Sequence, residues 1–411
     1  MGRLIWLAAL VACSKHSDAP PSPLQDGAVV AVVADAPLAI DAAVIIREAA
    51  TPTKLVVGPH AACTVMSDST VRCWGSNTEG QLGDGTTRSS SAAVAPNLRG
   101  VKDLVLGDDL ACALIDDSSV VCWGKIGFGK DHRTLAPAAA PGVRDVVRIF
   151  AVGGAACGTE KSGALVCWGD VDARGHVTTT GNAHAPTPVP GVDHVAQLTA
   201  HAALTDDKKL VIWTDGGAPS PTSLGPATQL AERDGVPCVL RDSGDVVCVA
   251  DHALCGAPLP LTAAPPPPAK LDKPKKKPKQ KAKKPKPKPA PVATKLAAYA
   301  LPEKATALAF DAGACVISQG KLDCFDLDHG CKLVRPWPAF VTVAETSGSC
   351  ARLANGTVRC GTPGTPAAPL IAGVAGATVL AATAARGCAL VKGHDVTCWE
   401  GTTPASPIAM P

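Results

Sequence analysis

The residues best suited to chemistry in this sequence are its cysteines, and their spacing is regular. Six pairs are separated by ten residues and a seventh pair by nine. Thiols at a fixed short spacing either join as disulfides or bind a soft metal ion such as Zn²⁺. The seven pairs are Cys63 and Cys73, Cys112 and Cys122, Cys157 and Cys167, Cys238 and Cys248, Cys315 and Cys324, Cys350 and Cys360, and Cys388 and Cys398.

A segment that keeps the pattern but lacks cysteines favours disulfides over metal. Residues 201–213 align with residues 111–123, and Ala202 and Ile212 stand where the two cysteines would be. Because a lone thiol would be a reactive liability, the loss of both together indicates a covalent pair. Metal binding by reduced pairs is the alternative. It is disfavoured because Cys-x-x-Cys and His-Glu-x-x-His are absent, so we expect no metal site and no cofactor.

Each cysteine pair is predicted to cross-link the two strands of a β-hairpin. Glycine lies near the middle of several ten-residue spans, as at Gly163, Gly244 and Gly356, and suits a three-residue loop with one left-handed residue. The nine-residue span would instead turn on Gln319 and Gly320. Opposed residues in antiparallel strands lie roughly 4.5–5.5 Å apart, within the range a disulfide tolerates. Each bridge would contribute at most about 2.5–3 kcal/mol.

The hairpins recur with a second element, an apolar strand with alternating polarity that follows Pro or Gly. Such strands are predicted in residues 100–106, 142–149, 191–198 and 373–380, and the first strand in residues 54–57. Most steps between successive hairpins are 35–49 residues, a period that suits one four-stranded propeller blade of about 40–50 residues. The sequence therefore predicts an all-β fold, a β-propeller of seven to eight short blades with disulfide-linked hairpins.

The first unit carries the densest motif. Residues 73–86 read Cys-Trp-Gly-Ser-Asn-Thr-Glu-Gly-Gln-Leu-Gly-Asp-Gly-Thr, followed by Pro96, a valine-rich strand at 101–106 and Cys112-Ala-Leu. This pattern resembles a repeat of the regulator of chromosome condensation family, and the resemblance covers about residues 51–411. It implies a closed propeller, usually seven-bladed in the family. Because few residues follow Trp399, we expect residues 51–60 to complete the last blade.

The amino-terminal residues resemble a bacterial lipoprotein signal. Arg3 precedes an apolar run, and Leu10-Val-Ala-Cys13 fits a lipobox with Cys13 as the acylated residue. The run is short, since signal peptides usually have about 15–30 residues. Seventeen cysteines also favour an oxidising, exported location. We therefore expect a protein of the bacterial cell envelope, anchored by lipid, in the outer membrane facing the periplasm or the surface.

A basic insert interrupts the repeats. Residues 270–289 hold eleven lysines and one aspartate, and the remainder of the chain has 28 basic and 35 acidic residues. Pro and repelling charges without large apolar residues predict an extended, disordered segment at 261–295. Cys255 and Cys331 flank the insert and are expected to pair. The segment is either a solvated spacer or an electrostatic binding segment for an anionic envelope polymer. In the second case the lysines expected to bind are Lys275, Lys276, Lys277, Lys283 and Lys284.

These segments define the predicted domain organisation. Residues 1–13 form the signal peptide and lipobox, and residues 14–50 an Ala/Pro-rich tether. The propeller occupies residues 51–260 and 296–411, on either side of the disordered insert.

No motif in the sequence carries catalysis. Residues 124–131 nearly match a phosphate-binding loop, but they lack its Ser or Thr and lie in a predicted blade turn rather than between a strand and a helix. No Gly-x-Ser-x-Gly occurs. The acidic pairs Asp108-Asp109, Asp116-Asp117 and Asp206-Asp207 are expected in turns, where Asp is favoured.

The function expected from these features is binding without catalysis. We expect a monomeric scaffold of the envelope that binds another protein, or an anionic polymer, and recognises no specific nucleic acid. Members of the family that the sequence resembles bind partners on a propeller face, and the eukaryotic namesake promotes nucleotide exchange on a small GTPase. The alternatives are therefore such a GTPase regulator, or an enzyme with its site in the central channel.

Overall fold

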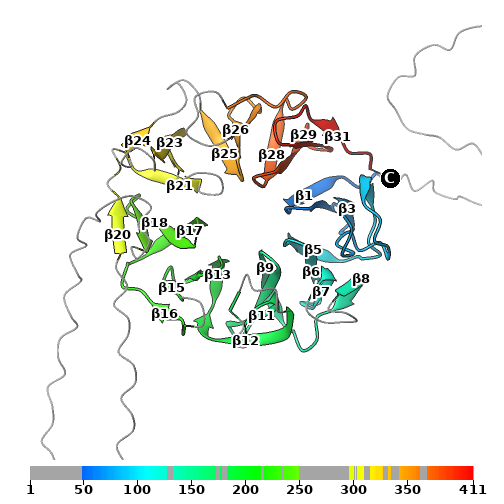
Figure 1. Ribbon diagram of the computed structural model, residues 1–411, viewed down its shortest axis with the longest axis horizontal. Coiled ribbons are helices and arrows are strands. Elements are labelled where there is room, and N and C mark those ends of the chain that lie inside the picture. Colours follow the sequence, from blue (N-terminus) through cyan, green and yellow to red (C-terminus); the bar gives the residue numbers. More distant parts are fainter. Residues whose placement is uncertain are drawn as a thin grey trace, which may run out of the picture. The chain divides into compact units, whose positions relative to one another are not determined.

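The chain forms an eight-bladed β-propeller. In the computed structural model, the residues described all belong to the unit Ala49–Pro411, and they form eight antiparallel sheets around a central axis (Figure 1). The described ranges are 49–126, 133–172, 176–177, 183–213, 217–233, 235–249, 296–299, 301, 303–309, 315–326, 332–334, 342–361 and 368–410. The predicted fold class is confirmed, and the number of blades is eight.

Each blade is built from consecutive strands, with the first strand nearest the axis. Blades 1 to 4 comprise β1 (Pro52–Val57), β2 (Ala61–Met66), β3 (Val71–Gly75), β4 (Ser90–Val94); β5 (Val101–Leu106), β6 (Leu110–Ile115), β7 (Val120–Lys125), β8 (Arg133–Ala139); β9 (Val146–Val152), β10 (Ala155–Glu160), β11 (Ala164–Asp170), β12 (Ala183–Asp193); and β13 (Val195–Leu198), β14 (Ala202–Thr205), β15 (Leu210–Ile212), β16 (Ser220–Pro221).

Blades 5 to 8 follow the same plan, and in blade 7 three strands and the isolated bridge between Arg359 and Leu370 lie within the described residues. Their strands are β17 (Ala227–Arg233), β18 (Val236–Arg241), β19 (Val246–Val249), β20 (Leu296–Tyr299); β21 (Ala305–Ala309), β22 (Cys315–Ser318), β23 (Lys321–Asp326), β24 (Lys332–Val334); β25 (Val343–Ser347), β26 (Cys350–Leu353), β27 (Val358–Cys360); and β28 (Ala377–Ala382), β29 (Arg386–Val391), β30 (Asp395–Glu400), β31 (Ser406–Pro407).

The predicted hairpins are the second and third strands of seven blades. In each of them the two cysteines face each other across the strand pair and form a disulfide, with Cα atoms 3.9–4.1 Å apart. These Cα atoms are closer than the predicted 4.5–5.5 Å. Blade 4 has Ala202 opposite Ile212 at the same place, as the sequence indicated.

The turns of these hairpins match the glycine positions. Gly163, Gly244 and Gly356 have φ of 93°, 84° and 77°, the left-handed region that the three-residue loop requires. In the shorter hairpin, Gln319 and Gly320 have φ of 50° and 74°. Two successive positive values are typical of the tight two-residue turn that matches strand twist.

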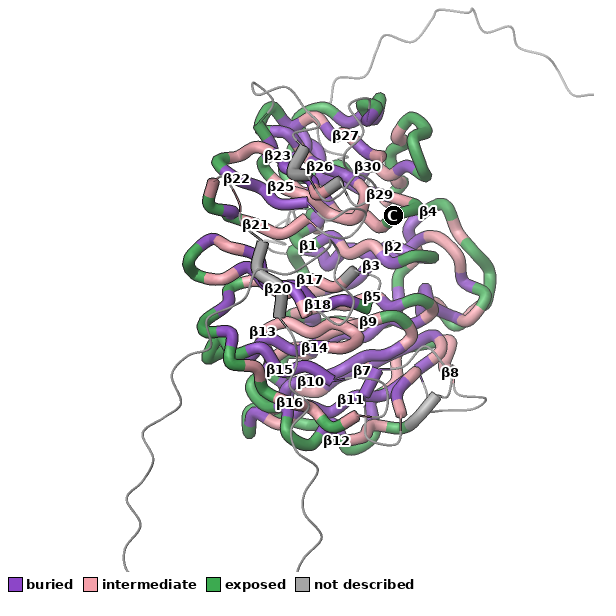
Figure 2. Tube along the Cα trace, turned by 60° about the vertical axis from the view of Figure 1, so that its left-hand side comes forward, coloured by how far each residue is buried: buried purple, intermediate pink, exposed green. Residues whose placement is uncertain are grey.

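The core is divided among the interfaces between neighbouring blades. Each buried cluster takes the Cys pair of one blade, or its apolar equivalent, together with apolar residues of the next blade. Between blades 1 and 2, for example, Cys63 and Cys73 share a cluster with Leu104 and Trp123. Figure 2 shows buried residues concentrated along the strands and exposed residues mainly at the turns. The disulfides therefore fill the core in a chain with only 3% aromatic residues.

A β-bulge recurs in the first strand of every blade, near the start of its pairing with the second strand. Several side chains next to the bulge reach the first strand of the following blade. Gln197 Oε1 accepts a hydrogen bond from the Leu230 amide at 2.7 Å, and Gln229 Oε1 accepts one from the Leu308 amide at 2.7 Å. Bulges re-aim side chains, and here they connect neighbouring blades near the central axis.

The ring closes differently from the prediction. The expectation that residues 51–60 complete the last blade is wrong, because β1 pairs with β2 as the first strand of blade 1. The last blade contains its own fourth strand, β31. The next residues extend to blade 1, where the Ala93 amide donates to the Ala409 carbonyl oxygen at 3.1 Å. Consecutive strands thus complete each blade, and the segment after β30 joins the two ends of the ring.

The basic insert lies within one blade. β19 ends at Val249, and its partner β20 begins at Leu296, so residues 250–295 connect the third and fourth strands of blade 5. The insert residues lie outside the described ranges. Among the residues that the structure describes, no helix has the length and apolarity needed to span a bilayer.

Candidate functional site

The loop after the third strand of blade 1 is folded around one buried side chain. Asn77 is fully buried; its Nδ2 donates to the Thr86 and Arg88 carbonyl oxygens at 3.0 and 3.1 Å. Its Oδ1 accepts from the Leu82 amide at 2.9 Å. These bonds satisfy backbone groups that a long loop would otherwise leave unpaired. The Gly-Gln-Leu-Gly stretch, residues 80–83, is thereby held in one conformation.

This loop lies on the next blade and covers its tryptophan. Trp123 Nε1 donates to the Gln81 carbonyl oxygen at 2.9 Å, and Leu82 is fully buried in the same cluster as Trp123. Gly83 lies flat against the indole, where a Cβ atom would come within 2.8 Å of Trp123 Cδ1. The loop then pairs with β8, since the Gly85 amide donates to the Leu135 carbonyl oxygen at 2.9 Å.

Two further blades show a similar covering of tryptophan by a loop residue of the preceding blade. Ile126 of blade 2 is buried in one cluster with Trp168 of blade 3. His176 of blade 3 stacks on Trp213 of blade 4, with ring centroids 5.8 Å apart and an interplanar angle of 18°. A loop seated on the next tryptophan is therefore a repeated contact of this propeller.

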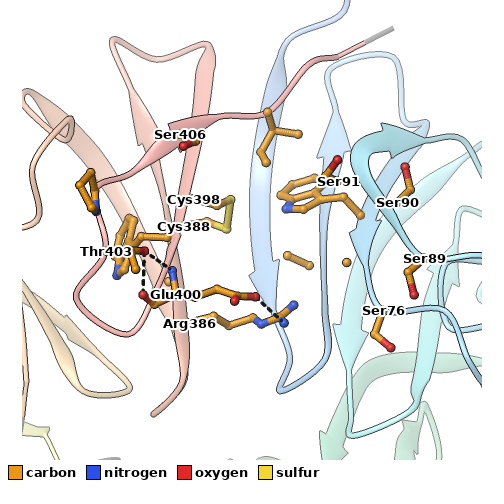
Figure 3. A pocket seen from close by; sticks show the side chains of 17 residues that line it. Ser76, Ser89, Ser90, Ser91, Arg386, Cys388, Cys398, Glu400, Thr403 and Ser406 are labelled. Atoms are coloured by element: carbon orange, nitrogen blue, oxygen red, sulfur yellow. Dashed lines mark hydrogen bonds and ion pairs between the residues drawn. A yellow bond between two sulfur atoms is a disulfide. The ribbon is translucent and has the colours of Figure 1, made fainter.

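Blade 8 lacks such a loop. Its strands β30 and β31 are joined by the short turn 401–405, in which Thr403 Oγ1 donates to the Glu400 carbonyl oxygen at 2.8 Å. The result is a pocket of about 500 Å³ between blades 8 and 1, which we call the seam pocket (Figure 3). Its lining includes Trp74, Ser76, Ser89, Ser90, Ser91, Arg386, Trp399, Glu400, Thr403 and Ser406.

Strand register shows that the seam pocket occupies the place where the loop sits on blade 2. Trp74 lies opposite Ala62 just as Trp123 lies opposite Ala111. Ser90 lies opposite Gly75 just as Thr134 lies opposite Gly124. Ser89, Ser90 and Ser91 therefore correspond to Arg133, Thr134 and Leu135, the residues that the blade 1 loop contacts. The seam pocket is an unfilled copy of an internal contact site.

Polar groups converge on the seam pocket. Arg386 Nη1 donates to the His60 carbonyl oxygen at 2.7 Å, and Arg386 Nη2 pairs with Glu400 at 3.1 Å. Arg386 Nε is buried and has no acceptor within the described part of the chain. Trp399 Nε1 also has none there, but Trp399 packs in the buried cluster between blades 7 and 8. Among the described residues, Trp74 makes no hydrogen bond corresponding to that of Trp123. Unsatisfied buried donors cost free energy, so a ligand with carbonyl oxygens would be stabilised here.

A second polar cluster lies on the turns between the first two strands of blades 1 and 2. His60 Nδ1 lies 2.9 Å from Asp109 Oδ1, and Gln81 Nε2 donates to the same oxygen at 3.3 Å. Burial raises the pKa of the Asp108 carboxyl above its ordinary value, and the neighbouring carboxylates of Asp109 and Asp170 raise it further. These groups are paired with one another and do not line the seam pocket. Their contacts hold adjacent blades together.

The sequence-predicted residues are distributed as follows. Fourteen cysteines form the seven predicted disulfides. The acidic pairs lie in turns as expected. Gly124 lies near the end of the third strand of blade 2, and most of the phosphate-loop-like segment after it lies outside the described residues. Also outside them lie Cys13, Cys255, Cys331 and the lysines Lys275, Lys276, Lys277, Lys283 and Lys284.

Within the described ranges, no group of three or more His, Cys, Asp or Glu side chains is placed to hold a metal ion. The seam pocket was not predicted from the sequence. The Gly-Gln-Leu-Gly stretch occurs once, at residues 80–83, so its absence from residues 401–405 did not distinguish blade 8 from the other blades.

These features define an eight-bladed, disulfide-linked β-propeller with an unfilled pocket between blades 8 and 1. No protein-family model and no curated protein matches the sequence. Among solved structures, human WBSCR16 is 18% identical over 48% of this chain and 61% of its own length, with a TM-score of 0.40. Prp20p from Saccharomyces cerevisiae is 16% identical over 87% of this chain and 76% of its own, with a TM-score of 0.42.

A third similar structure is the CRINKLY WD40 ectodomain of the Arabidopsis thaliana receptor kinase ACR4. It is 15% identical over 87% of this chain and 98% of its own, with a TM-score of 0.41. This chain spans less than two thirds of the WBSCR16 chain. At these identities and TM-scores, the similar structures transfer no family, ligand or activity to the protein.

Proposed function

We propose that the protein is a non-catalytic binding scaffold that holds a partner protein at the seam pocket. The observation that carries this proposal is the pocket beside Trp74, the tryptophan of blade 1, where Arg386 Nε is buried without an acceptor in the described part of the chain. Pockets of about 300–1,000 Å³ with a few convergent polar groups are typical binding sites. The pocket lacks the paired nucleophile and base that catalysis would need, since its reactive side chains are one Arg, one Glu and hydroxyl groups.

The proposed location is the bacterial cell envelope, with a lipid anchor at Cys13. Seven buried disulfides suit an oxidising compartment, because cytosolic thiols are kept reduced. Labelling with radioactive palmitate is expected in the wild type and lost in Cys13→Ala. Free thiols titrated in protein isolated without reductant would contradict the exported location.

The basic insert is proposed to add attraction to an anionic envelope polymer. It leaves blade 5 through the same strand connection, third to fourth, that carries the covering loop in blade 1. The lysines are proposed to act by charge alone. Deleting residues 265–290 is expected to reduce retention on isolated envelope polymer and to make the remaining retention less sensitive to salt.

The proposed partner site is tested by photo-crosslinking in cells. Benzoylphenylalanine replaces Thr402, an exposed residue of the turn beside the seam pocket; Ser223, exposed in blade 4, is the control position. A protein adduct is expected at Thr402 and not at Ser223, and mass spectrometry identifies its partner peptide. The same adduct pattern at both positions, or no protein adduct at Thr402, would contradict the proposal.

A further inference from the structure

The molecule contains its own example of a ligand for a site like the seam pocket. Residues 81–83 of the blade 1 loop contact the surface of blade 2 in three ways. The Gln81 carbonyl oxygen accepts from Trp123 Nε1, the Leu82 side chain packs in the apolar cluster, and Gly83 lies against the indole ring. The equivalent wall of blade 1 is intact. Trp74 is 4% exposed and shares a cluster with Ala62 and Ala93, with Ile408 packed at its edge.

We infer that the seam pocket binds an extended peptide segment of a partner protein containing leucine between glycines, in the manner of Gly-Gln-Leu-Gly on blade 2. This inference rests on the proposed function and names the chemistry of the partner. The peptide carbonyl preceding leucine would accept from Trp74 Nε1. A further carbonyl would face Arg386 Nε, the buried donor of the pocket wall that lacks an acceptor in the described residues.

Glycine is required by the closeness of the indole. A Cβ on Gly83 would approach Trp123 to 2.8 Å, closer than real Cβ contacts, so the residue after leucine must be glycine. The glycine before the Gln-Leu pair is less constrained on blade 1. On blade 2 a Cβ on Gly80 would meet Leu135 at 2.6 Å, whereas the corresponding residue of blade 1 is the shorter Ser91.

A peptide fits the seam pocket better than a saccharide does. Sugar binding by tryptophan uses an exposed ring face, and both Trp74 and Trp399 are only 4% exposed. What the pocket offers is the unpaired Nε–H donor of Arg386 in its wall and serine hydroxyls at its rim. Those groups match a backbone with regularly spaced carbonyl oxygens.

The test uses the full chain and a synthetic peptide with the sequence of residues 77–88, which keeps the asparagine that folds the loop. Isothermal titration is expected to show saturable one-site binding. Changing the peptide leucine to aspartate, or the glycine after it to alanine, is expected to weaken binding at least tenfold. Alanine at the glycine before the Gln-Leu pair is expected to weaken it less than threefold.

Protein variants locate the site. Ser91→Trp fills the seam pocket and is expected to abolish binding, whereas Ser223→Trp, the same change at an exposed serine of blade 4, leaves it unchanged. Trp74→Phe keeps an aromatic ring without the donor and is expected to weaken binding several-fold; because Trp74 is buried, the unfolding midpoint is also expected to fall, and binding is measured well below it. Thermal unfolding of each variant confirms that it is folded.

Three results would overturn the inference: no peptide binding at millimolar concentration, equal binding of the leucine-to-aspartate peptide, or binding that Ser91→Trp leaves intact. Chitohexaose serves as the saccharide probe. Its binding in place of the peptide, with loss in Ser91→Trp, would also overturn the inference. A protein adduct at Thr402 without peptide binding would retain the proposed function and reject only the glycine-leucine peptide as the ligand. If neither the adduct nor peptide binding is found, the proposed function and the peptide inference are both rejected.

Discussion

Ala202 of β14 lies directly opposite Ile212 of β15, at the cross-strand position that a disulfide occupies in the seven other blades. Both side chains are buried and pack with Val239 and Val247 of the next blade. The Ile212 side chain fills the space that the disulfide sulfurs fill in the other blades. The presence of Ala at 202 and Ile at 212 in place of two cysteines is therefore coupled by packing as well as by the pairing of thiols.

Ala202→Cys combined with Ile212→Cys is expected to form an eighth disulfide. The bridge would add at most about 2.5–3 kcal/mol to the free energy of unfolding, and loss of the buried isoleucine would offset about 1 kcal/mol of it. Peptide mapping without reductant detects the bond, and urea unfolding measures the gain. A free thiol at both positions in the folded protein would contradict the register, and Ala202→Cys alone is the control.

Gly83→Ala is expected to lower the free energy of unfolding by about 2–3 kcal/mol, since its φ is 72° and the new Cβ would press on Trp123. Gly85→Ala is the matched control. Gly85 has a similar φ of 82°, but a Cβ atom added there would meet nothing within 4 Å, so only the backbone cost of about 1 kcal/mol applies. Equal losses of unfolding free energy in Gly83→Ala and Gly85→Ala, measured by urea unfolding, would show that residue 83 does not contact the Trp123 indole.

Asp108→Asn is expected to raise stability at pH 7. Partial desolvation and nearby carboxylates raise the pKa of Asp108, so the native state binds this proton more tightly than the unfolded state does. The cost to folding is present above the raised folded-state pKa and vanishes below the ordinary value of 3.8. The gain should be below about 1 kcal/mol because the side chain is only partly desolvated and remains in contact with solvent. Thermal unfolding at pH 7 and pH 3 checks it, and an equal gain at both pH values would contradict the electrostatic cause.

Gln229→Ala is expected to cost about 1–2 kcal/mol, because it leaves the Leu308 amide without its acceptor. Gln229→Glu keeps an acceptor oxygen and should retain most of the stability. Hydrogen exchange at Leu308, followed by mass spectrometry, should accelerate in the alanine variant. Unchanged exchange at Leu308 would show that the link between blades 5 and 6 does not hold the strand.

The hairpins could be predicted from the sequence because their determinants are local. Ten residues between cysteines with a glycine in the middle allow essentially one antiparallel pairing, and Gln319-Gly320 shortens it by one residue. The wrong expectation concerned the ends of the ring. Nothing in residues 51–60 distinguishes a first strand of blade 1 from a closing strand of blade 8, since both would be short and apolar.

The seam pocket could not be predicted from local pattern because its walls come from opposite ends of the chain. Arg386 donates to the His60 carbonyl oxygen across 326 residues. Likewise, the bulged first strands look like ordinary alternating strands in sequence. Only their place beside the next blade shows that Gln197 and Gln229 serve as connectors.

The hydrogen bond between the Ala93 amide and the Ala409 carbonyl oxygen sets an order of events during synthesis. Blade 1 emerges from the ribosome first, and the residue that secures its outer strand is added after every other strand of the ring. Until then the nascent protein is an open arc with an exposed apolar face at each end. Newly made chains would therefore depend on chaperones that shield the apolar faces of the first and last blades until translation finishes.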